Sequence, residues 1–253
     1  MPNRRQALQI IAALSLGVSP LKILAQSAPA NAGALAPETP LQATLARIEQ
    51  RSGGKLGLRI VHARSGRNWT WRDDERFPMC SSFKLLLVAQ ALRQVADGGL
   101  QLDERIRYGR NDLQAWSPIT KKNARHGGMP IGALCAATLA TSDNTAANLL
   151  IARLGGPATF TAFMRSLGDE VTRLDRTEPA MNAPDPQGVL DSSSPRAMAH
   201  SLKRLLLGDG LPPAQRDQLK TWLKASITGN RRLKAGLPAG WSIASKTGTS
   251  DLG

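Results

Sequence analysis

One segment constrains the fold more than any other, because it predicts a helix that is buried on several sides. Between residues 82 and 96, apolar side chains surround most of the helix circumference. They are Leu85, Leu86, Val88, Ala89, Leu92 and Val95. Asp97-Gly98-Gly99 ends the helix. Such a helix needs other elements around it, and 253 residues, 42% of them hydrophobic, are enough to supply them.

Weaker patterns predict the surrounding elements. The apolar and turn residues predict helices near 41–48, 130–140, 144–154, 157–167, 195–207 and 212–226, a hairpin of strands near 56–60 and 69–71, and a further strand over 241–246. Residues 173–191 lack periodicity and carry three prolines, which predicts a long functional loop or an irregular connector. This order predicts an α+β fold, with a helical part over about 82–226 inserted into a sheet domain.

The N-terminus predicts export. Arg4 and Arg5 precede an apolar stretch over 7–18 that is too short to span a bilayer, and small residues follow. We therefore expect a signal peptide over 1–30, a linker over 31–40 and a catalytic domain over 41–253. The run 3–8 resembles a twin-arginine signal, although the export route stays open. The expected location is the periplasm or the exterior, without stable membrane insertion after signal removal.

Charge and histidine spacing argue against two classes of partner. The net charge of +14 falls to +11 without residues 1–30, but the basic residues are scattered and few aromatics accompany them. We therefore expect no nucleic acid. The three histidines, His62, His126 and His200, lack metal-ligand spacing, so we expect no metal site and no cofactor.

A Ser-x-x-Lys motif places an amine one helical turn from a hydroxyl, where the amine can activate it as a nucleophile. The chain holds three copies, which begin at Ser19, Ser52 and Ser81. The first lies in the export segment, and the second has Gly-Gly between its two residues. Only Ser81 opens a buried helix, whose N-terminus favours developing negative charge. Helix context therefore selects Ser81 with Lys84.

Two further motifs complete the pattern. Ser142-Asp143-Asn144 offers a hydroxyl for proton transfer and an amide for binding. Lys246-Thr247-Gly248 offers a lysine that can bind an anion. The three motifs in this order resemble those of class A β-lactamases and penicillin-binding proteins. The segment Arg173-Leu174-Asp175-Arg176-Thr177-Glu178-Pro179-Ala180-Met181-Asn182 resembles class A β-lactamases in particular. The resemblance runs from about residue 41 to the end.

The resemblance implies hydrolysis of penicillin-like amides through an acyl-enzyme, which gives antibiotic resistance. Ser81 would attack, and either Lys84 or Glu178 through a water would take its proton. Ser142 would protonate the leaving nitrogen. Glu178 would then activate the deacylating water, which Asn182 helps to hold. The amides of Ser81 and Thr249 would form the oxyanion hole.

The resemblance also implies binding and structural roles. Lys246, Thr247 and Thr249 would hold the substrate carboxylate beside Gly248, and Asn144 the side-chain amide. Trp116 matches an aromatic at the entrance, and Arg232 an arginine that supplements carboxylate binding. Arg176 and Asp191 match an ion pair that closes the loop, and the Glu178–Pro179 bond is expected to be cis.

The two cysteines are predicted to be free. Relatives link the position of Cys135 to the middle of the catalytic helix, which here is Val88. Cys80 lies about 12 Å away along that helix, and a disulfide needs Cα atoms within about 7 Å.

The implied fold is an antiparallel sheet packed with helices, plus an all-α subdomain, with the active site between them. The family continues for two more strands and a C-terminal helix, so we expect this chain to be incomplete at its C-terminus. The expected strand over 241–246 would then lack its sheet neighbours. The expected molecule is a monomer that acts on a small molecule. The alternatives are a penicillin-binding D,D-peptidase or penicillin sensor of the same fold, and an inactive fragment or binding module.

Overall fold

The computed structural model describes residues 39–250, so the predicted signal peptide and most of the linker lie outside the described residues. Its elements, in chain order, are α1 Pro40–Ser52, β1 Leu58–Val61, β2 Asn68–Trp71, β3 Phe77–Pro78, η1 Cys80–Ser82, α2 Phe83–Ala96, β4 Arg105–Ile106, η2 Arg110–Asp112, α3 Thr120–Asn123, η3 Ala124–His126, β5 Met129–Pro130, α4 Ile131–Ala140, α5 Asn144–Arg153, α6 Pro157–Ser166, η4 Ala180–Asn182, β6 Ser192–Ser193, α7 Pro195–Leu206, α8 Pro213–Lys224 and η5 Leu233–Gly236.

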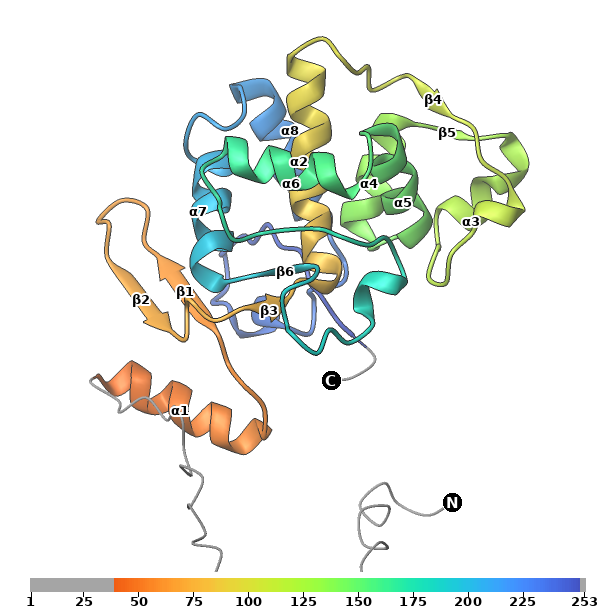
Figure 1. The fold of residues 1–253 in the computed structure, drawn as a ribbon. Helices are drawn as coiled ribbons and strands as arrows, with labels where there is room; N and C mark the ends of the chain where they lie inside the picture. Colours follow the sequence, from red (N-terminus) through yellow and green to blue (C-terminus); the bar gives the residue numbers. More distant parts are fainter. Residues whose placement is uncertain (1–38, 251–253) are drawn as a thin grey trace, which may run out of the picture.

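Helix α2 runs through the middle of the helical part, with other helices around it (Figure 1). It contacts α4, α5, α6 and α8. Phe83, Leu86 and Val88 are fully buried, and the Phe83 ring packs edge-on against Phe160 at a centroid distance of 6.2 Å. The prediction of a helix buried on several sides is therefore confirmed, and this burial fixes the position of its N-terminus.

Local sequence sets where the surrounding helices begin. Asp143 caps α5 by accepting a hydrogen bond from the Ala146 amide, and Ser194 caps α7 through the Ala197 amide. Proline stands in the first turn of α1, α6, α7 and α8, where its missing N–H costs nothing. The helices expected near 130–140, 144–154, 157–167, 195–207 and 212–226 are confirmed, with ends shifted by only a few residues.

The strands form three antiparallel pairs, β1–β2, β3–β6 and β4–β5. The predicted hairpin is confirmed, with Leu58 opposite Trp71 and Val61 opposite Asn68. The β1–β2 hairpin lies against α7 and beside α1 (Figure 1). Arg72 at the end of β2 pairs with Glu49 of α1 at 2.8 Å, and that ion pair ties α1 to the hairpin. The α+β class is therefore confirmed.

The strand predicted over 241–246 is wrong for the part of the chain that the structure describes. Residues 241–250 have no regular structure and pair with no strand within 39–250. Alternating side chains give a segment two faces, but a strand also needs a neighbouring backbone to bond with. Side-chain contacts to Ser142 and Thr228, and a backbone hydrogen bond from Ser245 to the Leu223 carbonyl, hold this segment instead.

Candidate active site

The first two site residues come from one short turn. Ser81 lies in η1 and Lys84 in the first turn of α2. The Lys84 Nζ donates to Ser81 Oγ at 3.0 Å. Cys80, just before Ser81, has φ 43°, a left-handed conformation that non-glycine residues adopt rarely. The buried wall of α2 and this strained residue together fix the direction of the Ser81 hydroxyl.

Glu178 reaches the same point from the loop over 173–191. Its carboxylate is buried, and Oε1 lies 2.9 Å from Lys84 Nζ. The Ser81 hydroxyl donates to the same oxygen at 3.3 Å. Asn182 donates from Nδ2 to Oε2 at 2.7 Å, so both carboxylate oxygens are engaged. A nucleophile, an amine and a carboxylate thus share one hydrogen-bonded cluster.

The loop that carries Glu178 is closed at its base. Arg176 Nε lies 2.6 Å from Asp191 Oδ2, and Asp191 Oδ1 accepts the backbone amides of Asp175 and Arg176. Asp191 is buried, so removing Arg176 would leave an uncompensated charge. The Glu178–Pro179 peptide bond is cis, as predicted.

Asn148 holds the backbone of Glu178 and was missed from the sequence. Its Oδ1 accepts the Glu178 amide at 3.0 Å, and its Nδ2 donates to the Glu178 carbonyl at 2.7 Å. The available signal was its position one helical turn after Asn144, among apolar residues of α5. Its amide fixes Glu178 without touching the carboxylate.

Ser142 and Asn144 flank the junction of α4 and α5. Lys84 Nζ donates to the Ser142 carbonyl at 3.0 Å and to Asn144 Oδ1 at 2.5 Å. Ser142 has φ 63°, which turns the chain sharply toward Lys84. Asp143 is fully buried, and its carboxylate accepts hydrogen bonds from Ile119, Thr120 and Ala146. These bonds stabilise the junction between α4 and α5.

The segment over 246–248 closes the opposite side. Lys246 Nζ donates to Ser142 Oγ at 3.0 Å, and Lys84 Nζ lies 3.4 Å from that same oxygen. The Thr247 hydroxyl donates to Thr228 Oγ1 at 2.8 Å, a contact with no signal in the sequence. A Cβ on Gly248 would lie 2.6 Å from the Met79 carbonyl oxygen. Only glycine therefore lets this segment approach the turn that carries Ser81.

A cleft of about 430 Å³ opens between these parts. It is lined by Ser81, Ala115, Trp116, Ser142, Asn144, Glu178, Asn182, Thr228, Arg232, Thr247, Thr249 and Ser250. Trp116 is 66% exposed at the mouth, and its Nε1 donates to the Thr141 carbonyl at 2.9 Å. Five of the predicted binding residues therefore line the cleft, namely Trp116, Asn144, Arg232, Thr247 and Thr249. Lys246 and Gly248 are not among the lining residues, but Lys246 contacts Ser142, which is.

Burial lowers the pKa of both lysines in the site. Burial lowers the pKa of Lys84, and the neighbouring Glu178 carboxylate opposes that change. Burial, together with the charge of Lys84, lowers the pKa of Lys246 to about 7. The hydroxyl of Ser142 therefore lies between two amines that exchange protons more readily than ordinary lysines.

Neither the cysteines nor metal ligands add to this cluster. Cys80 and Cys135 are both buried and free, as predicted. Within residues 39–250, no group of histidine, cysteine and carboxylate side chains has the arrangement of a metal site.

Comparison with known proteins shows which family has a similar sequence. Residues 40–252 match the model of the β-lactamase enzyme family. β-Lactamase OXY-1 of Klebsiella oxytoca is 45% identical, over 84% of this chain and 73% of the relative. The carbapenem-hydrolysing β-lactamase KPC of Klebsiella oxytoca is 48% identical, over 81% and 69%. β-Lactamase Toho-1 of Escherichia coli is 42% identical, over 99% and 82%.

Solved structures agree. An ancestral class A β-lactamase is 53% identical with a TM-score of 0.81, covering 83% of this chain and 81% of that one. A β-lactamase from Burkholderia vietnamiensis is 47% identical with a TM-score of 0.82, covering 84% and 78%.

Proposed function

The chain belongs to the class A serine β-lactamases, and from that premise we propose that it hydrolyses penicillin-like amides through an acyl-enzyme on Ser81. The observation that carries this proposal is the shared contact of Ser81, Lys84 and Glu178, with distances of 2.9 to 3.3 Å. A hydrolase of this class removes the antibiotic and so gives resistance.

Acylation uses the contacts around the Ser81 hydroxyl. That hydroxyl donates toward Glu178, while Lys84 donates to its oxygen, so the carboxylate can receive the proton and the ammonium can stabilise the alkoxide. The amides of Ser81 and Thr249 are proposed to bind the developing oxyanion. Ser142, bonded to Lys246 and close to Lys84, is proposed to deliver a proton to the leaving nitrogen.

Deacylation needs a water and a base. Asn182 donates a hydrogen bond from Nδ2 to the Glu178 carboxylate. The other amide atom of Asn182, the buried Oδ1, has no hydrogen-bond partner within residues 39–250. A free acceptor beside a carboxylate suits a water that Glu178 would activate. This pairing favours a hydrolase over a D,D-peptidase or penicillin sensor, which would keep the acyl group.

The substrate carboxylate is proposed to bind Lys246, Thr247 and Thr249, with Arg232 as a second cation and Gly248 giving close access. Asn144 and the exposed Trp116 are proposed to contact the substrate side chain. We also propose that the protein is exported and acts as a monomer. Within residues 39–250 the structure has no helix of the length and apolarity needed to cross a bilayer.

The experiment that tests the proposal is a trapped reaction with benzylpenicillin. We expect turnover of the antibiotic, and an acid-quenched sample should carry the opened drug on the tryptic peptide 77–84. The chain contains its own control, since Ser52 also belongs to a Ser-x-x-Lys motif but lies exposed at the end of α1. An adduct on Ser52, or turnover without any adduct on Ser81, would contradict the assignment.

Lys246 gives a pH dependence. Because its pKa in the free enzyme is lowered to about 7, the ammonium is present below that pH and is lost above it. We expect the KM for benzylpenicillin to rise as pH increases from about 7 to 9, with a smaller change in kcat. Lys246→Arg should flatten the KM profile, because arginine stays charged. A KM that is flat for both proteins would exclude Lys246 as the carboxylate partner.

A further inference from the structure

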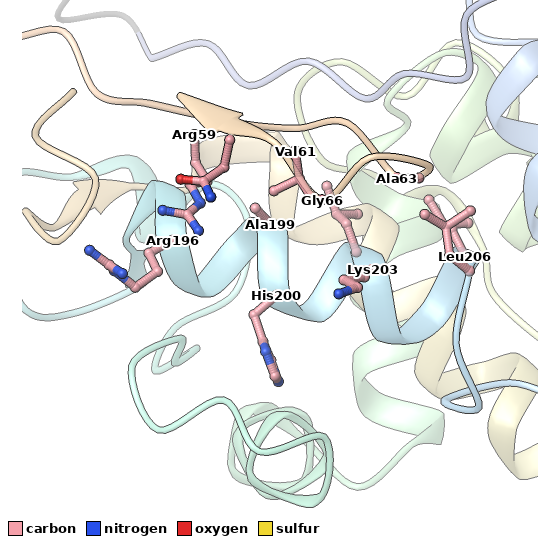
Figure 2. A pocket seen from close by; sticks show the side chains of 12 residues that line it. Arg59, Val61, Ala63, Gly66, Arg196, Ala199, His200, Lys203 and Leu206 are labelled. Atoms are coloured by element: carbon pink, nitrogen blue, oxygen red, sulfur yellow. The ribbon is translucent and has the colours of Figure 1, made fainter. Parts of the chain in front are cut away.

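One wall of the active-site cleft is held by a closed ring of hydrogen bonds. The ring joins the loop over 113–118 to the first turn of α5, next to Trp116 and Asn144, which line the cleft. The groove between β1 and α7, shown in Figure 2, shares no lining residue with that cleft. The loop over 113–118 is therefore in a position to affect a bound substrate, whereas the β1–β2 hairpin and α7 are not.

The backbone of Gln114 and the hydroxyls of Ser117 and Thr145 form the ring. The Gln114 amide donates to Thr145 Oγ1 at 2.7 Å, and the Ser117 hydroxyl donates to the Gln114 carbonyl at 2.8 Å. The two hydroxyl oxygens lie 2.7 Å apart. Because a hydroxyl has one hydrogen and that of Ser117 is already used, the Thr145 hydroxyl donates to Ser117 Oγ. All three hydrogen bonds therefore run in the same sense around the ring, so that each strengthens the next.

Burial prevents water from replacing the members of this ring. Ser117 is 6% exposed and Thr145 is 1% exposed. The Thr145 amide also donates to Ser117 Oγ at 3.3 Å, so the donor and both acceptor sites of the Ser117 hydroxyl are engaged. Without the Thr145 hydroxyl, the Gln114 amide would lose its acceptor, and an unpaired buried donor is costly. The loop and α5 are therefore held in one relative position.

The ring encloses the two residues that are proposed to contact the substrate side chain. Trp116 has φ 58°, a left-handed conformation that non-glycine residues adopt rarely and that surrounding contacts must maintain. The ring spans this residue from Gln114 to Ser117. The Trp116 carbonyl accepts the Asn144 amide at 3.0 Å, and the Asn144 side chain donates to the Ala115 carbonyl at 2.9 Å. Opening the ring should therefore release both Trp116 and Asn144.

We propose that Ser117 and Thr145 are positioning residues that make the cleft selective for the side chain of its substrate. Neither residue lines the cleft, so both act through Trp116 and Asn144. This inference rests on the proposed function, since it concerns a substrate whose amide Ser81 opens. Misplacing the Asn144 amide would lose its contact with the side-chain amide of the substrate and would leave the reacting amide bond in place.

Two substrates separate this role from a general loss of structure. Benzylpenicillin carries an acyl side chain, and 6-aminopenicillanic acid is the same bicyclic nucleus without it. In Thr145→Val, which keeps the shape of the side chain, we expect kcat/KM for benzylpenicillin to fall about tenfold, mostly through KM, as for the loss of about one hydrogen bond. The value for 6-aminopenicillanic acid should change less than about twofold, because it lacks the atoms that the ring helps to place.

Three further variants test whether the hydroxyl is the cause. Thr145→Ser keeps the hydroxyl and should behave as the wild type. Ser117→Ala opens the same ring from the other side, so it should repeat the effect, and the double variant should be no worse than either single one. The matched control is Thr138→Val on α4, where a fully buried threonine has no hydrogen-bond partner for its hydroxyl within residues 39–250. This control should change neither substrate.

A spectroscopic readout follows Trp116 without any hydrolysis. Protein that contains 5-fluorotryptophan carries five fluorine labels, and Trp116→Phe identifies the resonance of Trp116. That resonance should be a single narrow line in the wild-type, Thr145→Ser and Thr138→Val proteins. In Thr145→Val and Ser117→Ala it should shift and broaden, while the remaining resonances stay in place.

Three results would overturn the proposal. An equal fall of kcat/KM for the two substrates would indicate damage to the whole site. An unchanged Trp116 resonance in both Thr145→Val and Ser117→Ala would show that the ring does not hold the tryptophan. A Thr145→Ser protein that behaves like Thr145→Val would remove the hydroxyl as the cause. If the wild type hydrolysed neither substrate, the proposed function would fail, while the fluorine spectra would still decide whether the ring positions Trp116.

Discussion

Glu178→Gln is expected to leave a protein that still acylates with benzylpenicillin but releases it about 10²- to 10⁴-fold more slowly. Glutamine keeps the shape of the side chain but has no basic oxygen, so it cannot activate the deacylating water. Ser81 keeps its contact with Lys84 at 3.0 Å, and the pKa of Lys84 falls further once the Glu178 charge no longer opposes the effect of burial, so the Lys84 amine can take the Ser81 proton in place of the carboxylate. Intact-mass spectrometry should find the drug on nearly every molecule within seconds, while hydrolysis in the steady state falls to that slow rate.

The control for this variant is Glu170→Gln. Glu170 stands in the same part of the chain, but its side chain is 78% exposed, and its one ion pair within residues 39–250 is a 3.4 Å contact to Arg165. It should leave turnover and adduct lifetime unchanged. A wild-type protein that already holds the adduct for minutes, with Glu178→Gln adding nothing, would instead support a penicillin sensor.

The sequence predicted the site better than it predicted the sheet. Ser81 and Lys84 lie three residues apart on a helix whose burial was evident from its pattern, so their contact follows from local geometry. The other site residues were placed only by resemblance to a family. Spacing along the chain says nothing about how Glu178, 97 residues from Ser81, comes to bond its hydroxyl.

What the sequence missed depends on long-range contacts. Asn148 looks like any polar residue on a helix until the loop over 173–191 is folded onto it. Thr228 lies in an irregular segment and acquires its role from Thr247. The strand expected over 241–246 failed for the same reason, because alternation is a local property and pairing is not.

Lys84→Met should destabilise the protein by about 3–5 kcal/mol, because it leaves the Glu178 carboxylate buried without its cation. Both side chains are almost fully buried, and Lys84 also satisfies the Ser142 carbonyl and Asn144 Oδ1. Urea unfolding should show a lower midpoint with an unchanged slope. Acylation should also fail, since no ammonium remains to stabilise the Ser81 alkoxide.

A second substitution, at Glu178, separates the two causes of the lower stability, which are the stranded carboxylate and the lost hydrogen bonds of Lys84. Adding Glu178→Gln to Lys84→Met removes the stranded charge, so the double variant should recover part of the stability but no activity. The recovery should be incomplete, because the Ser142 and Asn144 acceptors stay unpaired. Lys224→Met, a substitution at an exposed lysine of α8, should leave the urea midpoint unchanged. If the double variant were no more stable than Lys84→Met, the buried carboxylate would not be the source of the instability, and the ion pair would serve catalysis alone.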